Sequence, residues 1–317
     1  MILYAFTPNY SLHLLQIIII AMRFSKYYAA GITAFLIWGF FSFGLRPINH
    51  YPSLDILFYR LFFCVPIMLA ITLLFRRNTI TETREVIKYM EKPERTKLLW
   101  LTLGSALLLV SNWFIFIYVM NHISVNAASF AYLVCPILTT VLAFFILREK
   151  LTPTQWLAVS LSILGCALLS YNNFTSIFYS LVVAATYALY LIIQKKIVGI
   201  DKFLLLNVQL VIIAIILAPF YPYYSGPVPQ EVSFYGYIGI IAVLFTIIPL
   251  FLNLYALKGI SSSSVGILLY INPIIGFVLS AVYYNEPITL FQVMAYSLIL
   301  VSIVVFNSKA LIKQKTV

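Results

Sequence analysis

Residues 132–155 read YLVCPILTTVLAFFILREKLTPTQ, and residues 269–292 read LYINPIIGFVLSAVYYNEPITLFQ, 137 positions later. Three landmarks keep their spacing in the two segments: Pro136, Glu149 and Gln155 in the first, and Pro273, Glu286 and Gln292 in the second. Extended without a gap to residues 114–161 and 251–298, the alignment holds 14 identities in 48 positions. General hydrophobicity does not align proline, glutamate and glutamine at fixed spacing. The chain therefore contains an internal duplication.

The composition assigns the chain to the membrane. Of its 317 residues, 63% are hydrophobic and only 9% are charged, whereas soluble domains carry about 25% charged residues. The apolar runs approach the roughly 20 residues that a helix needs to cross a bilayer, and barrel strands are shorter, at about ten residues. The sequence therefore predicts an all-α polytopic membrane protein with ten transmembrane helices. The predicted spans are 28–45, 54–75, 98–120, 125–147, 154–171, 174–194, 203–222, 234–257, 262–284 and 287–307.

The duplication also predicts how the two halves are oriented. We divide the chain into a first repeat, 23–172, a second repeat, 173–308, and a basic tail, 309–317. Each repeat has five helices, an odd number, so the second must enter the membrane from the opposite side. Inverted repeats around a midplane site are a recurring plan of secondary transporters. The alternative is that duplication merely built a stable helix bundle.

The N-terminus is treated separately. Residues 12–22 are apolar but short, and neither a basic region nor a small-residue cleavage site marks a signal peptide there. Met22 opens a basic start with Arg23 and Lys26, directly before the first good span. We interpret residues 1–22 as an extension that is not part of the working protein, and an extra helix there is the alternative.

Lysine and arginine predict the orientation in the membrane. With ten spans, 18 of the 20 basic residues fall on one side, while Arg46 lies in a loop on the other side and Arg60 lies inside a span. Because cytoplasmic loops are enriched in lysine and arginine, both termini are predicted to be cytoplasmic. The net charge of +11 is spread over these loops, where it meets anionic lipid. A nucleic-acid partner would need one basic face, so none is expected.

Catalytic motifs are missing from the sequence. The patterns GxSxG, HExxH and CxxC do not occur, and the three cysteines are isolated within apolar runs. We therefore expect no enzyme activity, no metal site and no cofactor. The functional classes left beside a permease are a helper or sensor that moves no solute and, less favoured, a membrane-embedded transferase.

A set of short segments carries a family resemblance. They are residues 31–39 (GITAFLIWG), Asp55 with Tyr59-Arg60, Asn112-Trp113, Asn121-His122, Ala128-Ser129, Tyr132, Pro136, Glu149, Gln155-Trp156, Thr246 with Pro249-Leu250, Gly266, residues 270–273 (YINP), and Tyr284 with Glu286-Pro287. Together they resemble the EamA family of the drug/metabolite transporter superfamily, in particular its chloramphenicol-sensitive, RarD-type branch.

The resemblance implies a ten-helix permease of the bacterial inner (plasma) membrane, an exporter with two EamA repeats and no prosthetic group. Asp55 and Tyr59 stand where that branch usually has Glu and His, and Cys135 and Leu269 replace Asn and Gln. These positions belong to helices that can face the cavity, so the substrate preference of the branch need not carry over.

Arg60 is the first candidate for a solute-binding residue. It lies about 9 Å inside the second span, at 1.5 Å per residue, and charges inside a membrane usually face a cavity or a partner. Asp55 is five positions away, on a different side of the helix, and is therefore a poor partner. Arg60 either holds a carboxylate or another anionic group, or it snorkels to the headgroups or caps another helix end.

Further candidates are polar or aromatic residues within the spans. Asn112 and Trp113 lie in the middle of their predicted helix. The amide of Asn112 is expected to bind either a solute or another helix. Trp113 and Trp38 are each expected either to line a cavity or to pack in the core. Tyr132, Tyr270 and Asn272 lie within a turn of Pro136 or Pro273, and we expect them to contact solute. The two prolines are hinges or fixed kinks.

The acidic turns receive a structural interpretation. Glu149 and Glu286 are expected to cap the helices that follow them, and Ser261–Ser264 is expected to form a turn and N-cap. A mixture of Trp, Tyr, Asn and one Arg suits a small amphipathic metabolite as the solute. The expected partners are that solute and membrane lipid, with a homodimer as an open alternative. Proton antiport and facilitated exchange both remain open.

Overall fold

The computed structural model describes residues 26–122, 125–170, 174–283 and 290–312. Residues 1–22, Glu286 and the tail from 313 lie outside this part of the chain, so the expectations about them stay predictions. The described residues form helices and no strand. In chain order the helices are Lys26–Gly39, α2 (Phe41–Leu45), α3 (Ser53–Phe75), α4 (Arg77–Tyr89), α5 (Lys92–His122), α6 (Val125–Leu147), α7 (Pro153–Ser170), α8 (Phe174–Lys196), α9 (Lys202–Leu217), α10 (Tyr221–Tyr224), α11 (Val232–Ala242), α12 (Ile248–Gly259), α13 (Ser262–Leu268), α14 (Ile271–Val282) and α15 (Leu290–Ile312).

Ten apolar segments of the described residues correspond to the ten predicted spans. Five are long enough to cross a membrane by themselves: Ser53–Phe75, Lys92–Val119, Phe178–Lys196, Lys202–Tyr224 and Val232–Gly259. Lys26–Gly39 and Phe41–Ile48 make a sixth, bent by 42°. Four shorter apolar helices complete the set: Ala131–Leu147, Pro153–Leu168, Ser262–Gly276 and Val293–Phe306. The predicted fold class, an all-α polytopic membrane protein, is confirmed.

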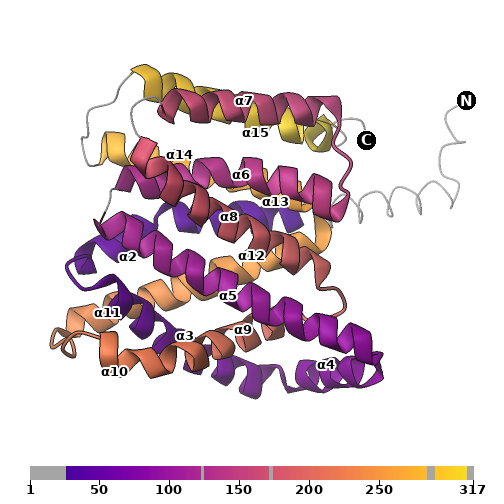
Figure 1. The fold of residues 1–317 in the computed structure, drawn as a ribbon, viewed down its shortest axis with the longest axis vertical. Helices are drawn as coiled ribbons and strands as arrows, with labels where there is room; N and C mark the ends of the chain where they lie inside the picture. The colour runs from indigo at the N-terminus through magenta and orange to yellow at the C-terminus, as the bar shows by residue number, and fades with distance from the viewer. Residues whose placement is uncertain (1–25, 123–124, 171–173, 284–289, 313–317) are drawn as a thin grey trace, which may run out of the picture.

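Helices of the two halves interleave. Figure 1 shows α7 and α15 side by side at one edge of the molecule, with α3, α9 and α11 toward the opposite edge. Between them, α6 of the first half packs against both α8 and α13 of the second. The largest buried apolar cluster likewise draws side chains from both halves, including Phe35, Leu57, Tyr190 and Phe245. A site at the centre of the bundle is therefore built by both repeats.

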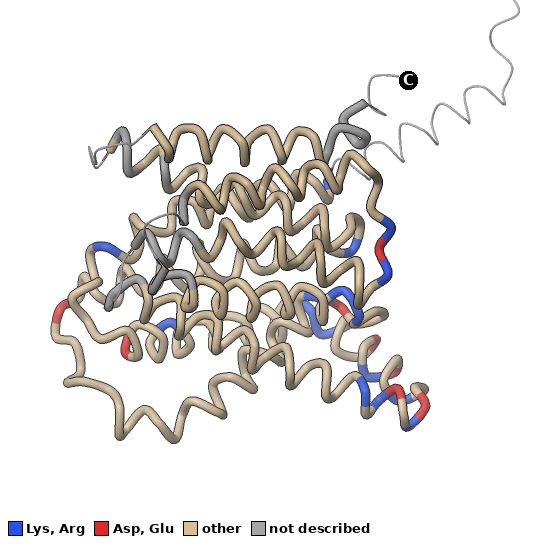
Figure 2. Tube along the Cα trace, turned by 45° about the horizontal axis from the view of Figure 1, so that its top comes forward, with Lys and Arg blue, Asp and Glu red and all other residues tan. Residues whose placement is uncertain are grey.

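The charged residues gather at one end of the bundle. Figure 2 shows most lysines and arginines over α4 and over the α6–α7 and α8–α9 turns, and we call this the basic end. There, Asp201 caps the N-terminus of α9 by accepting from the N–H groups of Phe203 and Leu204. The same carboxylate pairs with Arg76 at 3.3 Å and Lys258 at 3.8 Å. These contacts tie together the ends of α3, α9 and α12.

The acidic turn of the first repeat caps a helix, but not the one that we expected. Instead of α7, Glu149 caps the N-terminus of α13, where its carboxylate accepts from the N–H groups of Ser262 and Ser263. The start of α7 is capped by Thr152 and Gln155, whose Oε1 accepts from the Thr152 N–H at 2.9 Å. The expected turn and N-cap at Ser261–Ser264 is present, because Ser261 Oγ accepts from Ser264 N–H at 3.0 Å.

Candidate functional site

Arg60 lies buried between the two halves, with 5% of its surface exposed. It is the eighth residue of α3, about 10 Å along that helix. Its Nε donates to Thr246 Oγ1 at 2.7 Å. The guanidinium lies over the ring of Trp113 in α5, with 4.1 Å from Cζ to the ring centroid, and 5.9 Å from the ring of Phe41 in α2. Three helices of the first half and one segment of the second therefore meet at this charge.

Thr246 belongs to an irregular segment of the eighth span. Between α11 and α12 the chain forms one π-helical stretch, η3 (Val243–Ile247), a feature that often marks functional sites. Thr246 Oγ1 donates to the Ile241 carbonyl at 2.7 Å while it accepts from Arg60. On the same segment, Cys64 Sγ donates to the Ala242 carbonyl at 3.6 Å. Two side chains of α3 therefore bind at the π-turn, Arg60 to the hydroxyl of Thr246 and Cys64 to the carbonyl just before the turn.

Pro249 explains the hydrogen bond that Trp38 makes to the eighth span. Proline has no N–H, so the carbonyl four residues earlier, that of Phe245, loses its α-helical donor. Trp38 Nε1, from the first helix, donates to this carbonyl at 2.9 Å. An unpaired carbonyl in the membrane interior costs several kcal/mol, so the indole replaces a bond that the sequence removes.

The charge of Arg60 has no acidic partner in the part of the chain that the structure describes. The ion pairs there are those of Asp201 at the basic end. The aromatic ring of Trp113 faces Arg60 instead, and Tyr132 of α6 lies near enough to interact with it electrostatically. A cation over an indole face is stabilised by about 2 kcal/mol when desolvated, which falls short of what an isolated buried charge loses in hydration. The site is therefore suited to an anionic group.

Two tyrosines and an asparagine extend the site beyond Arg60. Tyr132 packs against Phe116 with ring centroids 5.0 Å apart. Tyr187, from α8, meets Trp38 edge to face at 6.1 Å. Its hydroxyl accepts from Asn253 Nδ2 of α12 at 2.8 Å. The aromatic surface beside the charge is therefore assembled from helices of both halves. We use the name central cluster for seven residues: Arg60, Trp113, Trp38, Tyr132, Tyr187, Thr246 and Asn253.

Three predicted site residues lie elsewhere. Asn112 Nδ2 donates to the Val183 carbonyl at 2.9 Å and to Thr186 Oγ1 at 3.2 Å, so in this structure its amide links α5 to α8. Tyr270 is fully buried among residues of α7 and α15, on the far side of α6. Asn272, in the first turn of α14, is half-buried. The structure brings Arg60, Trp113, Trp38 and Tyr132 together, whereas Asn112 turns its amide toward α8 and Tyr270 packs in a different buried cluster.

The two prolines of the duplication occupy different backbones. Pro136 lies inside α6, which continues unbroken past it. Pro273 lies in the first turn of α14, just after a break between Leu268 and Ile271. A Cβ added to Gly266 of α13 would approach Thr139 of α6 at 3.0 Å. The helix that carries Pro136 is therefore in close contact with α13, and Pro273 follows the break between α13 and α14.

Two positions that depart from the RarD-type pattern do not face the central cluster. Both oxygens of Asp55 accept from the N–H of Gly226, at 3.1 and 3.2 Å, in the loop between α10 and α11. Tyr59 shares a 3.1 Å hydroxyl contact with Tyr221 of α10. Asp55 and Tyr59 therefore tie α3 to α10 and to the loop after it, at the end of the bundle opposite the basic end, and the expectation that their helix can face the cavity stays a prediction.

Sequence reasoning missed three members of the central cluster. Thr246 was noted only as part of the resemblance, although its place three residues before Pro249 marks an irregular backbone. Tyr187 and Asn253 are polar groups inside apolar runs, and both are almost fully buried. That polarity was the available signal, but it did not show which helix face each residue occupies.

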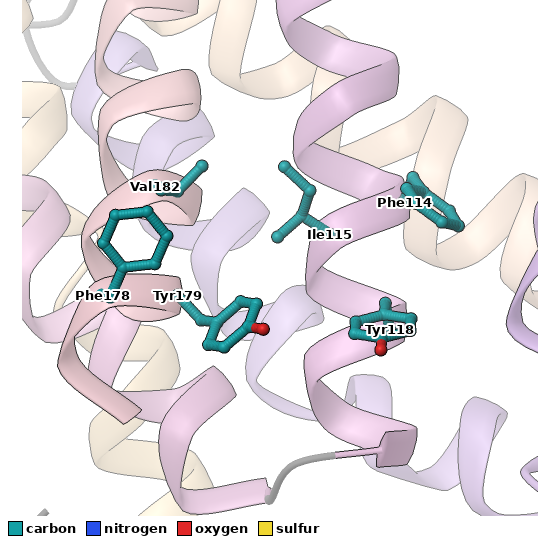
Figure 3. A pocket seen from close by; sticks show the side chains of 6 residues that line it. All are labelled: Phe114, Ile115, Tyr118, Phe178, Tyr179 and Val182. Atoms are coloured by element: carbon teal, nitrogen blue, oxygen red, sulfur yellow. The ribbon is translucent and has the colours of Figure 1, made fainter. Parts of the chain in front are cut away.

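A separate groove lies between α5 and α8. Figure 3 shows its lining side chains, with Ile115 and Tyr118 on one helix and Phe178, Tyr179 and Val182 on the other. Its volume is about 400 Å³ and Phe114 completes its lining. No charged side chain lines it, so we do not assign the anionic group there.

Comparison with known proteins also divides the chain into two similar halves. The model of the EamA-like transporter family matches twice, over residues 25–171 and 174–308. The chain belongs to the EamA-like transporter family. The first match contains Arg60 and Trp113, and the second contains Thr246, so in this EamA-like protein the central cluster lies where the two copies meet.

Relatives of this EamA-like chain are similar over nearly their whole length. A Bacillus subtilis protein named uncharacterized transporter YojE is 28% identical over 277 residues, 86% of this chain and 91% of that protein. Uncharacterized transporter PA0485 of Pseudomonas aeruginosa is 26% identical, with 89% and 93% covered. Protein RarD of Escherichia coli is 25% identical, with 90% and 94% covered. The resemblance to RarD seen in the short segments is confirmed.

A solved crystal structure shares the fold of the EamA-like chain. The two superpose with a TM-score of 0.68 over 92% of this chain and 99% of the other, at 15% sequence identity. At that identity the likeness speaks for the fold alone. In the described residues no group of three or more His, Cys, Asp or Glu side chains is arranged to hold a metal ion.

Proposed function

We propose that the protein is a permease that moves small amphipathic solutes carrying an anionic group across the membrane by alternating access. The observation behind this proposal is the buried guanidinium of Arg60, held by Thr246 and Trp113 between the two halves. Because Nε is bound to Thr246, the two terminal amino groups of the fork remain as donors for a carboxylate or phosphate. Trp38 and Tyr132 supply aromatic surface for an apolar solute body.

The proposed localisation is the bacterial inner membrane, with the basic end in the cytoplasm. The support for this orientation is the distribution of lysine and arginine, which favours the cytoplasmic side in short loops and gathers at one end of the bundle (Figure 2). Both termini then lie in the cytoplasm. The partners are the solute and membrane lipid, with no nucleic acid, and a homodimer is a second assembly to be measured by light scattering.

We further propose that residues 23–172 and 173–308 move against each other during transport. Alternating access in inverted-repeat transporters is largely rigid-body motion around a fixed site, and Arg60–Thr246 is a bond across that boundary. The proposal puts one hinge between α13 and α14, supported by the break before Pro273, and Pro136 marks the matching helix of the first repeat. The proposed net direction is export, as the RarD-type resemblance implies.

The central test is solute exchange in proteoliposomes. The purified protein is compared with Arg60→Gln for an aromatic carboxylate and for the matching amide. A charge-assisted pair contributes about 1.5–3 kcal/mol, so KM for the carboxylate should rise about ten- to a hundredfold, while the amide is moved equally by both. Arg77→Gln, which removes an exposed charge of α4, is the control for net charge.

Equal carboxylate flux in the wild type and Arg60→Gln would contradict the assigned role of Arg60. The same assay distinguishes the other functional classes. A helper or sensor would move neither solute, and a transferase would return a chemically altered one. Secretion by deletion and overexpression strains then reports the direction of transport.

A further inference from the structure

One face of α8 carries polar side chains from the central cluster to the basic end. Tyr187, Tyr190 and Gln194 are spaced three and four residues apart, so they lie above one another on the same face. Their exposed fractions are 4%, 0% and 0%. Tyr187 and Tyr190 stack with ring centroids 5.8 Å apart. Gln194 lies in the last turns of α8, next to Lys195, at the basic end.

Several atoms on this face are buried without a hydrogen bond. No hydrogen bond of standard geometry reaches either amide atom of Gln194 or the hydroxyl of Tyr190 among the described residues, although the two side chains are close enough to interact. Because that hydroxyl can pair with only one of the two amide atoms, at least one amide atom of Gln194 stays buried without a partner. Oδ1 of Asn253 in α12 is also buried without a hydrogen-bond partner among the described residues, while Nδ2 of the same amide donates to the Tyr187 hydroxyl. Buried polar groups are nearly always satisfied, and the exceptions call for an explanation. Single oxygens such as Asn207 Oδ1 and Gln209 Oε1 are also without a partner elsewhere in the described residues, but neither amide atom of Gln194 has a hydrogen bond of standard geometry. A second state in which water or solute reaches the α8 face accounts for its unsatisfied atoms.

The basic end of this face is closed by the turn between α12 and α13. Lys195 Nζ donates to the carbonyls of Leu257 and Ile260, at 2.6 and 2.7 Å, where α12 ends. Glu149 accepts from the Ser262 and Ser263 N–H groups at 2.9 and 3.2 Å, where α13 begins. Each charge complements the dipole of the helix end that it binds. Lys195 therefore binds the turn where α12 ends, and Glu149 binds it where α13 begins.

We propose that the face Tyr187–Tyr190–Gln194 lines the cytoplasmic half of the solute passage, where the Gln194 amide binds polar groups of the passing solute. Glu149 and Lys195 keep this passage shut by fixing the α12–α13 turn against α8. The inference rests on the proposed permease function and names where the solute leaves the Arg60 site. Opening requires Glu149 and Lys195 to release the turn, which exposes the unpartnered amide to water.

Cysteine labelling tests this passage without any solute. Gln194→Cys is made in a background in which Cys64, Cys135 and Cys166 are replaced, and inverted membrane vesicles receive a charged, membrane-impermeant thiosulfonate. Ile192→Cys is the matched control, because residue 192 is equally buried (1% exposed) but points to another side of α8. We expect Gln194→Cys to react slowly, and at least tenfold faster when Glu149→Gln or Lys195→Met is added. Ile192→Cys should stay unreactive in each background.

Glu149→Gln and Lys195→Met test the release of the turn independently, so the test survives if one of them fails to fold. Size-exclusion profiles verify that each variant is folded. The proposed passage would be overturned if Gln194→Cys reacted with the thiosulfonate no faster than Ile192→Cys in every folded background. Flux in the Arg60 assay is measured separately. Solute exchange without labelling of Gln194→Cys would contradict the proposed passage but not the permease function. Labelling without solute exchange would contradict the permease function and show only that a cleft opens at the α8 face.

Discussion

At the scale of single residues, neighbours in the sequence have different roles. Asn112 and Trp113 are adjacent, yet the amide of Asn112 binds α8 while the ring of Trp113 faces Arg60. One step along a helix turns the side chain by about 100°. The sequence showed that both are unusual residues for mid-membrane positions. Which of them faces the site depended on the rotation of α5 in the bundle.

A prediction at this scale concerns Gln194. Gln194→Leu removes two buried amide atoms, of which at least one has no partner, so the free energy of unfolding should rise by about 1–3 kcal/mol. Solute exchange should fall, because the proposed passage loses its amide. Thermal unfolding in detergent and flux in proteoliposomes measure the two effects.

Gln209 provides the matched control. It is equally buried, but its Nε2 donates to Ser105 Oγ at 2.6 Å, so that only its Oε1 lacks a partner. Gln209→Leu breaks that bond and should lower stability. If Gln194→Leu lowers stability by the same amount, then the Gln194 amide is already satisfied and the reasoning about the α8 face is wrong.

At the scale of elements, the eighth span shows how a local irregularity builds a site. Pro249 and the π-turn η3 leave backbone carbonyls without their α-helical donors, and Trp38 and Cys64 bind two of them from other helices. Thr246 is thereby presented to Arg60. Spans 234–257 and 54–75 could be predicted from hydropathy. The π-turn could not, because it depends on which neighbouring side chains satisfy the displaced backbone.

The bond between Trp38 and the eighth span can be tested by a double-mutant cycle. Trp38→Phe leaves the Phe245 carbonyl unpaired and should destabilise the protein by about 1–3 kcal/mol. Adding Pro249→Ala restores a backbone N–H at the position that the carbonyl needs, and it should recover part of that loss. The midpoint of thermal unfolding is the measurement. Losses that simply add would show that the indole and the proline act independently.

At the scale of the whole molecule, the repeats are interleaved rather than placed side by side. Because α6 packs against α8 and α13, and α7 against α15, each half buries its apolar surface on the other. Glu149 of the first repeat caps a helix of the second, although the sequence predicted a cap for the following helix. Local capping rules assume the nearest N-terminus, whereas tertiary packing brought a distant one closer.

Orientation is the prediction that belongs to this scale. A reporter enzyme that is active only outside the cytoplasm should be inactive when fused after residue 90, beyond α4. It should be active when fused after residue 228, in the loop between α10 and α11. Lysine and arginine at the basic end are the physical reason. The reverse pattern of activities would place the basic end outside and exchange the two sides in the proposed export scheme.

The sequence by itself determined the membrane environment, the ten spans and the duplication, because hydropathy, helix length and the spacing of Pro, Glu and Gln are properties of the chain alone. It also singled out Arg60, since a charge in an apolar run is visible without a structure. Only the tertiary structure decided that Arg60 meets Thr246 and Trp113, that Tyr270 faces the α7–α15 pair, and that Glu149 caps α13. Each of these contacts joins residues far apart in the chain or depends on how each helix is rotated in the bundle, and hydropathy carries little information about either.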